Sequence, residues 1–97
     1  MEEIEKDHKG APLGVTVLTT VGMFPSEDDY RRAHENETIQ KLLDEVKKAQ
    51  SLKDTSEWVL RLEPGHRDIN PDKTFKEEQL SCVIALEWHK REGGGGA

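Results

Sequence analysis

The residues with the clearest chemical potential are four consecutive glycines at positions 93–96, followed by Ala97. A glycine run by itself is typical of a flexible spacer or a cloning scar, because such a chain behaves as a random coil. Glycine also lacks a Cβ, so it fits between narrow walls and adopts dihedral angles that other residues avoid. The run is therefore either a linker or a functional segment that the rest of the chain presents. The choice between these two interpretations depends on which structural elements precede the run.

Other patterns that could support catalysis or metal binding are weak. The chain contains no CxxC or HExxH pattern, and no pair among its four histidines has metal-ligand spacing; these are His8, His34, His66 and His89. Glu77 and Glu78 are adjacent, so their side chains point apart on a helix or a strand, which disfavours paired acid–base catalysis. We therefore expect no metal, no cofactor and no enzymatic activity in this chain.

The single cysteine, Cys82, alternates with apolar residues in the segment "SCVIALEW". This pattern predicts a core residue of a strand rather than a nucleophile. One cysteine cannot form a disulfide within the chain, which fits a reducing compartment.

The composition limits the classes of function. Ninety-seven residues predict one domain, and 33% apolar against 35% charged residues leaves a modest core. A formal charge of −6 argues against a nucleic-acid binder or a protein of anionic membrane surfaces. No apolar run approaches a membrane span, and the polar start "MEEIEKDHKG" is unlike a signal peptide. We expect a cytoplasmic protein.

Hydrophobic periodicity predicts one helix and three or four strands. In "GVTVLTTVGMF" the residues Val15, Val17 and Val21 fall on one face at a spacing of two, which indicates a strand. "YRRAHE" is a weaker strand pattern, with Ala33 inward. "EWVLRL" and "SCVIALEW" alternate again, the latter with Cys82, Ile84, Leu86 and Trp88 on one face.

The helix pattern is the strongest in the chain. In "NETIQKLLDEVKKAQSL" one apolar stripe recurs at three- and four-residue steps, at Ile39, Leu42, Leu43, Val46 and Ala49. Asn36 or Thr38 is expected to cap the start of the helix through its side chain. One helix against a small mixed sheet is an α+β arrangement, in which the strands richest in β-branched residues, the first and the last, should be central. We expect an N-terminal arm at 1–13, a folded domain at 14–90 and a tail at 91–97.

This order of elements, read with the glycines, resembles the ubiquitin-like β-grasp family over about residues 14–96. "NETIQKLLDEV" is similar to the family's first helix, and "WVLRLEPGHRDINPDKTF" to its third strand, glycine turn, buried aliphatic residue and Thr-hydrophobe pair. Those roles fall to Leu60, Leu62, Gly65, Ile69, Asp72, Thr74 and Phe75. The resemblance implies a β-grasp fold, with a mixed four- to five-stranded sheet packed on one main helix.

The resemblance also implies a function for the glycines. A ubiquitin-like modifier supplies a C-terminal carboxylate, which an E1-like enzyme adenylates with ATP, an E2-like enzyme carries as a thioester, and a target lysine finally accepts. Gly93, Gly94, Gly95 and Gly96 would form the conjugation tail. A zinc-dependent JAB-type peptidase would first remove Ala97, with Gly96 as the expected mature terminus. The resemblance also implies that the chain is a bacterial ubiquitin-like modifier, encoded beside E1-like, E2-like and JAB-peptidase enzymes, as such proteins are, sometimes in operons for antiviral defence.

Two alternative functions remain open from the sequence. A β-grasp sulfur carrier would convert its terminal glycine to a thiocarboxylate, and a non-conjugated interaction module would use the tail as a spacer. Candidates for a partner-binding surface are Arg61, His66 and Arg91. Arg91 matches the basic residue that ubiquitin carries before its glycines. Arg61 stands where ubiquitin has an exposed isoleucine, so receptors for that apolar side chain should bind this surface poorly, because the guanidinium would have to be desolvated.

Overall fold

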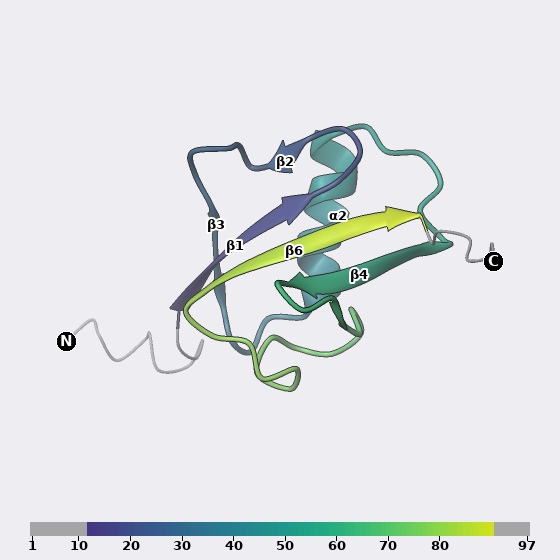
Figure 1. Cartoon of the computed structure of the whole chain (residues 1–97). Helices are drawn as coiled ribbons and strands as arrows, with labels where there is room; N and C mark the ends of the chain where they lie inside the picture. The colour runs from purple at the N-terminus through teal and green to yellow at the C-terminus, as the bar shows by residue number, and fades with distance from the viewer. Residues whose placement is uncertain (1–11, 91–97) are drawn as a thin grey trace.

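Residues 12–90, the part of the chain that the computed structural model describes, form a mixed sheet with one helix on one face (Figure 1). The elements in chain order are β1 (Pro12–Leu18), β2 (Met23–Phe24), β3 (Arg31–His34), α2 (Ile39–Ala49), β4 (Trp58–Glu63), β5 (Arg67–Asp68) and β6 (Val83–Lys90). This is the α+β arrangement that the sequence predicts. Strand β1 begins two residues before the expected start of the folded domain, because Leu13 is already buried in the core.

Strands β1 and β6 form the centre of the sheet, as their content of β-branched and aliphatic residues predicts. The order is β2-β1-β6-β4-β5, and β3 also pairs with β1. The β1–β6 pair is parallel and places Val15 opposite Ile84 and Val17 opposite Leu86. The sheet has six strands instead of the expected four to five, because β2 and β5 contain two residues each and no sequence period marks them.

The core lies between the sheet and α2. The inward positions of β1 and β6 are buried aliphatic or aromatic residues, and Leu60 of β4 and Ala33 of β3 are buried as predicted. The other two predicted inward residues of β4, Trp58 and Leu62, are partly buried and pack against this core. The irregular segment between β5 and β6 adds Ile69, Phe75 and Leu80, all at most 5% exposed. Ile69 and Phe75 therefore have the buried roles that the family resemblance gave them.

Helix α2 buries the predicted stripe except at its end. Ile39, Leu42, Leu43 and Val46 are buried, whereas Ala49 is exposed. The helix ends at Ala49, and Leu52 packs against the core beyond it. The prediction for Ala49 was wrong because the chain leaves the helical path at this point.

The start of α2 is capped by the backbone of another segment rather than by a side chain. Thr38 is the N-cap residue, but its hydroxyl makes no capping hydrogen bond. Instead, the amide N–H of Ile39 donates to the carbonyl of Lys73, and that of Gln40 donates to the carbonyl of Pro71. The predicted capping by Asn36 or Thr38 was wrong, because distant carbonyls satisfy two of the amides that a helix start leaves unpaired.

Two predicted strand positions lie outside the strands. Val21 is 60% exposed, because β1 ends at Leu18 and the backbones of Thr19 and Gly22 bond to each other in a tight turn. Cys82 is exposed and precedes β6, with φ 63°. A left-handed residue breaks the alternation of a strand. The prediction that Cys82 is a core residue was therefore wrong, and its thiol faces solvent.

A partly buried ion-pair cluster joins β3 to α2. The guanidinium of Arg31 donates to both carboxylate oxygens of Glu37, at 3.0 and 3.1 Å, and to both of Glu45, at 2.8 and 2.6 Å. Burial raises the pKa of Glu37, but the hydrogen bonds and charge of Arg31, the backbone N–H of His34 and the charge of Lys41 outweigh it. The net result is a pKa below the ordinary value of 4.5.

We predict that this cluster makes stability depend on pH in the acid range. A carboxyl group whose pKa is lower in the folded state stabilises the fold above its unfolded pKa, and this contribution is lost as pH falls through the folded pKa. Glu37→Gln should therefore cost about 1–2 kcal/mol of unfolding free energy at neutral pH. The difference in unfolding free energy between variant and wild type should decrease below about pH 4.5. Urea unfolding at a series of pH values measures this difference, and Glu27→Gln at an exposed position is the control. A difference that does not change with pH would contradict the prediction.

Candidate functional site

The end of β6 is held firmly in the sheet. Trp88 is 5% exposed and packs edge-to-face on Trp58, with ring centroids 5.2 Å apart and planes at 73°. Aromatic pairs in this geometry contribute about 0.5–1.5 kcal/mol beyond their buried area. In the β4–β6 register Trp58 lies opposite Lys90, the last residue that the structure describes. The point from which the glycine tail continues is therefore fixed relative to the core.

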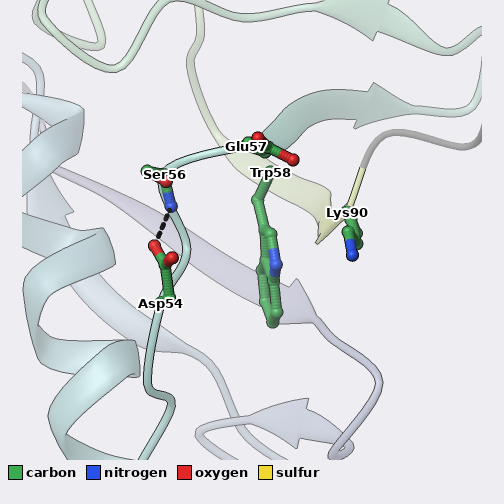
Figure 2. A pocket seen from close by; sticks show the side chains of 5 residues that line it. All are labelled: Asp54, Ser56, Glu57, Trp58 and Lys90. Carbon is green, nitrogen blue, oxygen red and sulfur yellow. Dashed lines mark hydrogen bonds between the residues drawn. The ribbon is translucent and has the colours of Figure 1, made fainter.

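A hollow of about 260 Å³ lies beside this point (Figure 2). Asp54, Ser56, Glu57, Trp58 and Lys90 line it. The backbone N–H of Ser56 donates to Asp54 Oδ1 at 3.1 Å, and hydrogen bonds from the backbone and side chain of Ser56 hold the pKa of Asp54 below its ordinary value. With two carboxylates, an ammonium group and an indole, the hollow can form hydrogen bonds and ion pairs with a polar or charged group.

The outer face of the sheet, turned away from α2, is the second candidate surface. Strand residues alternate between faces, so Arg61 and Glu63 of β4 share this face with Glu87 and His89 of β6. Arg61 lies directly opposite Glu87, but its Nε is 3.4 Å from Oδ1 of Asp68 on β5. This position is polar and partly exposed.

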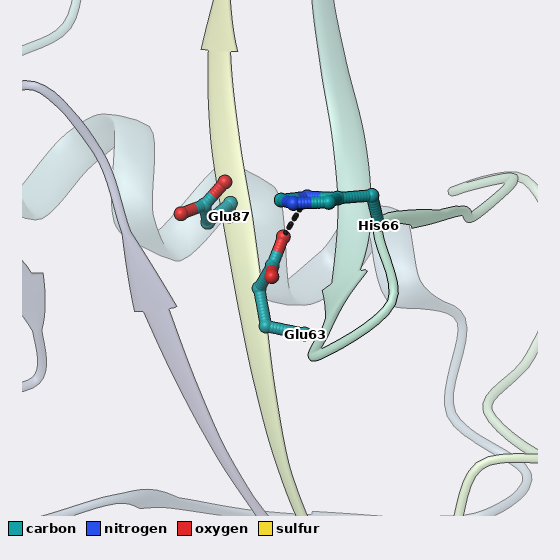
Figure 3. Close-up of side chains that lie close together, drawn as sticks. All are labelled: Glu63, His66 and Glu87. Carbon is teal, nitrogen blue, oxygen red and sulfur yellow. Dashed lines mark ion pairs between the residues drawn. The ribbon is translucent and has the colours of Figure 1, made fainter.

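His66 reaches this face from the turn between β4 and β5. Gly65 and His66 both have left-handed backbone angles, with φ 105° and 56°. Glycine adopts such angles readily, and histidine does so more often than most residues. The turn brings Nδ1 of His66 to 2.8 Å from Oε2 of Glu63 (Figure 3).

The structure thus places two of the predicted surface residues, Arg61 and His66, next to Glu63. Arg91 lies outside the described residues, as do the predicted conjugation tail, Gly93–Gly96, and the predicted processing site at Gly96 and Ala97. Sequence reasoning missed Glu63 and Glu87. The spacing of Glu63 and His66 on either side of Pro64-Gly65 is a signal that could have identified the first. Among residues 12–90, no helix has the length and apolar character needed to span a membrane.

Comparisons with known proteins agree with the fold. No protein-family model matches the chain, and no curated protein sequence matches it. A solved structure of a protein designed on the basis of ubiquitin has a TM-score of 0.63 at 20% identity, covering 89% of this chain and 96% of that one. The solution structure of an N-terminal ubiquitin-like domain has a TM-score of 0.59 at 11% identity, covering 86% and 78%. The chain has a ubiquitin-like β-grasp fold.

Proposed function

We propose that this chain is a ubiquitin-like protein modifier that becomes attached to target amines through the carbonyl of Gly96. The supporting observation is the continuity between fold and tail. The central strand β6 of a ubiquitin-like fold runs to Lys90, and Arg91, Glu92 and four glycines follow it in the sequence. This arrangement favours an acyl-delivery role for the glycines over a spacer.

The length of the tail suits delivery into an enzyme cleft. Six residues, 91–96, separate Lys90 from the proposed acyl carbon. When fully extended they span at most about 20 Å, at about 3.3–3.6 Å per residue. Backbone pairing with a strand of the partner can hold such a segment, and the absence of side chains at 93–96 lets its end pass a narrow entrance.

The chemistry belongs to partner enzymes. A JAB-type peptidase, using its own zinc-bound water, hydrolyses the bond between Gly96 and Ala97 and frees the Gly96 carboxylate. That carboxylate attacks the α-phosphorus of ATP on an E1-like enzyme and releases pyrophosphate. A cysteine thiolate then displaces AMP, a second thiolate on an E2-like enzyme takes the acyl group, and a lysine amine of the target displaces that thiolate to form an isopeptide bond. The modifier supplies the acyl group and the surface that these enzymes recognise.

Incubation with an E1-like activating enzyme, an E2-like conjugating enzyme and a JAB-type peptidase from the same organism tests the proposal. We expect intact mass to fall by one alanine residue, and denaturing gels to show an ATP-dependent ladder of slower bands. Replacement of one oxygen by sulfur would instead indicate a sulfur carrier. If neither the mass nor the gel pattern changes, the chain is an unconjugated interaction module.

A further inference from the structure

We propose that Glu63, His66 and Glu87 form a surface binding site for a divalent transition-metal ion, for which Zn²⁺ is the best match. The site lies on the outer face of the sheet, and its ligand Glu87 precedes the first tail glycine, Gly93, by six residues. The inference does not depend on the proposed modifier function. It departs from the sequence-based expectation that the chain binds no metal.

Three potential ligands converge there from two strands and a turn (Figure 3). One ligand atom from each of Glu63, His66 and Glu87 lies within 4.8 Å of the other two. The β4–β6 register creates this convergence, since Glu63 lies opposite Ala85, whose side chain occupies little space, and Glu87 lies two residues further along β6. His89 adds a fourth potential ligand nearby, with Nε2 at 3.6 Å from Oε1 of Glu87.

The carboxylate of Glu63 has an unsatisfied oxygen at the centre of this group. Its Oε2 is buried and accepts no hydrogen bond from any described residue, although Nδ1 of His66 is only 2.8 Å away. A buried acceptor without a partner destabilises the folded state. A cation placed between the lone pairs of Nδ1 and Oε2 would satisfy both atoms.

The neighbouring arginine does not neutralise the two carboxylates. Arg61 lies directly opposite Glu87 and two residues before Glu63, but its ion pair in the described part of the chain is with Asp68. The ion pairs of Glu63 and Glu87 among residues 12–90 are with His66 and His89. When these imidazoles are neutral, two negative charges face one small region, which attracts a divalent cation.

The donor set selects the type of metal. Imidazole nitrogen with carboxylate oxygen suits zinc, whereas calcium and magnesium prefer oxygen ligands alone. Zinc bonds of about 2.0–2.2 Å place tetrahedral ligands about 3.4 Å apart. Nδ1 of His66 and Oε2 of Glu63 must therefore separate from 2.8 Å, and the Glu87 carboxylate must turn toward them. Glu87 is 29% exposed and His66 is 64% exposed, so both have room to adjust. The open side of the site leaves a coordination position for water.

Titration of the full chain with zinc chloride, followed by calorimetry and by histidine-selective NMR, tests the site. We expect saturable binding at one equivalent, with the ring signals of His66 among those that shift most. Glu87→Gln and His66→Asn should each weaken binding at least as much as the 10–100-fold that loss of an outer-shell partner costs. Asparagine tolerates the left-handed backbone at position 66, so the turn should persist. Glu27→Gln removes the same charge at an exposed position away from the site and should bind zinc normally.

Two results would overturn the proposal. One is zinc binding that neither Glu87→Gln nor His66→Asn weakens, because the metal would then sit on other groups. The other is the absence of saturable zinc binding by a chain whose NMR spectrum shows it to be folded, which would leave His66 and Glu63 as a simple surface ion pair. Magnesium chloride should shift the same ring signals far less than zinc at equal concentration.

Discussion

Replacing Gly95 and Gly96 together by valine is expected to reduce thioester formation on the E1-like enzyme by at least about a hundredfold, without changing the thermal midpoint of the protein. Valine adds a branched side chain where the tail must enter a narrow cleft, and it restricts the backbone angles that glycine allows. A displacement of about 1 Å at the reacting carbonyl is enough for a rate loss on the order of a hundredfold. Single-turnover assays with processed protein measure this rate directly.

The thermal midpoint should stay constant because the core residues of the described domain lie between Leu13 and Trp88. Gly93→Val is the matched control, since it adds the same side chain three residues from the reacting carbonyl, and we expect a much smaller loss. Equal losses for the two variants would argue against a requirement for slender residues at the acyl end. A clear drop in the midpoint would show that the tail takes part in the fold, contrary to the proposal.

Replacing Phe75 by alanine is expected to destabilise the domain by about 3–5 kcal/mol, the range for large-to-small aromatic substitutions in a core. Phe75 is fully buried, and its amide N–H donates to the carbonyl of Glu37 just before α2. Loss of the ring therefore opens a cavity where the irregular segment meets the start of the helix. Small domains have only about 5–15 kcal/mol of stability, so much of it should disappear.

The other phenylalanine, Phe24, gives a control of identical chemistry. It lies at the margin of the core on β2 and is only partly buried, so Phe24→Ala should cost markedly less. Urea unfolding of the two variants measures the difference in unfolding free energy. Equal costs, or a larger cost at Phe24, would mean that the irregular segment does not complete the core in the way that the structure shows.

Elements in which a hydrophobic spacing repeats several times could be predicted from the sequence. The helix stripe from Ile39 to Val46 and the alternation in β4 and β6 each repeat several times, so a single exception does not hide the pattern. The same reasoning failed where the chain leaves its regular path. The hydrophobic spacing in the sequence continues through Val21, Ala49 and Cys82. In the structure a tight turn interrupts it before Val21, the helix ends at Ala49, and Cys82 has a left-handed backbone.

Interactions between distant segments could not be predicted in the same way. The carbonyls of Pro71 and Lys73 cap a helix that begins more than thirty residues earlier, and nothing local marks them as acceptors. The convergence of Glu63, His66 and Glu87 likewise depends on the β4–β6 register and on the turn after β4. These residues are separated in the sequence, and they come close together only when strands β4 and β6 pair.

Tandem mass spectrometry of conjugates is the most direct test of the central claim. Trypsin cleaves after Arg91, so a target lysine joined to Gly96 should retain the five residues Glu92–Gly96 on its ε-amine. The account predicts this branched peptide in samples that contain ATP and the cognate enzymes, and its loss when ATP is omitted. Tail peptides that still end in Ala97 with no branched lysine, under conditions in which the activating enzyme consumes ATP, would contradict it.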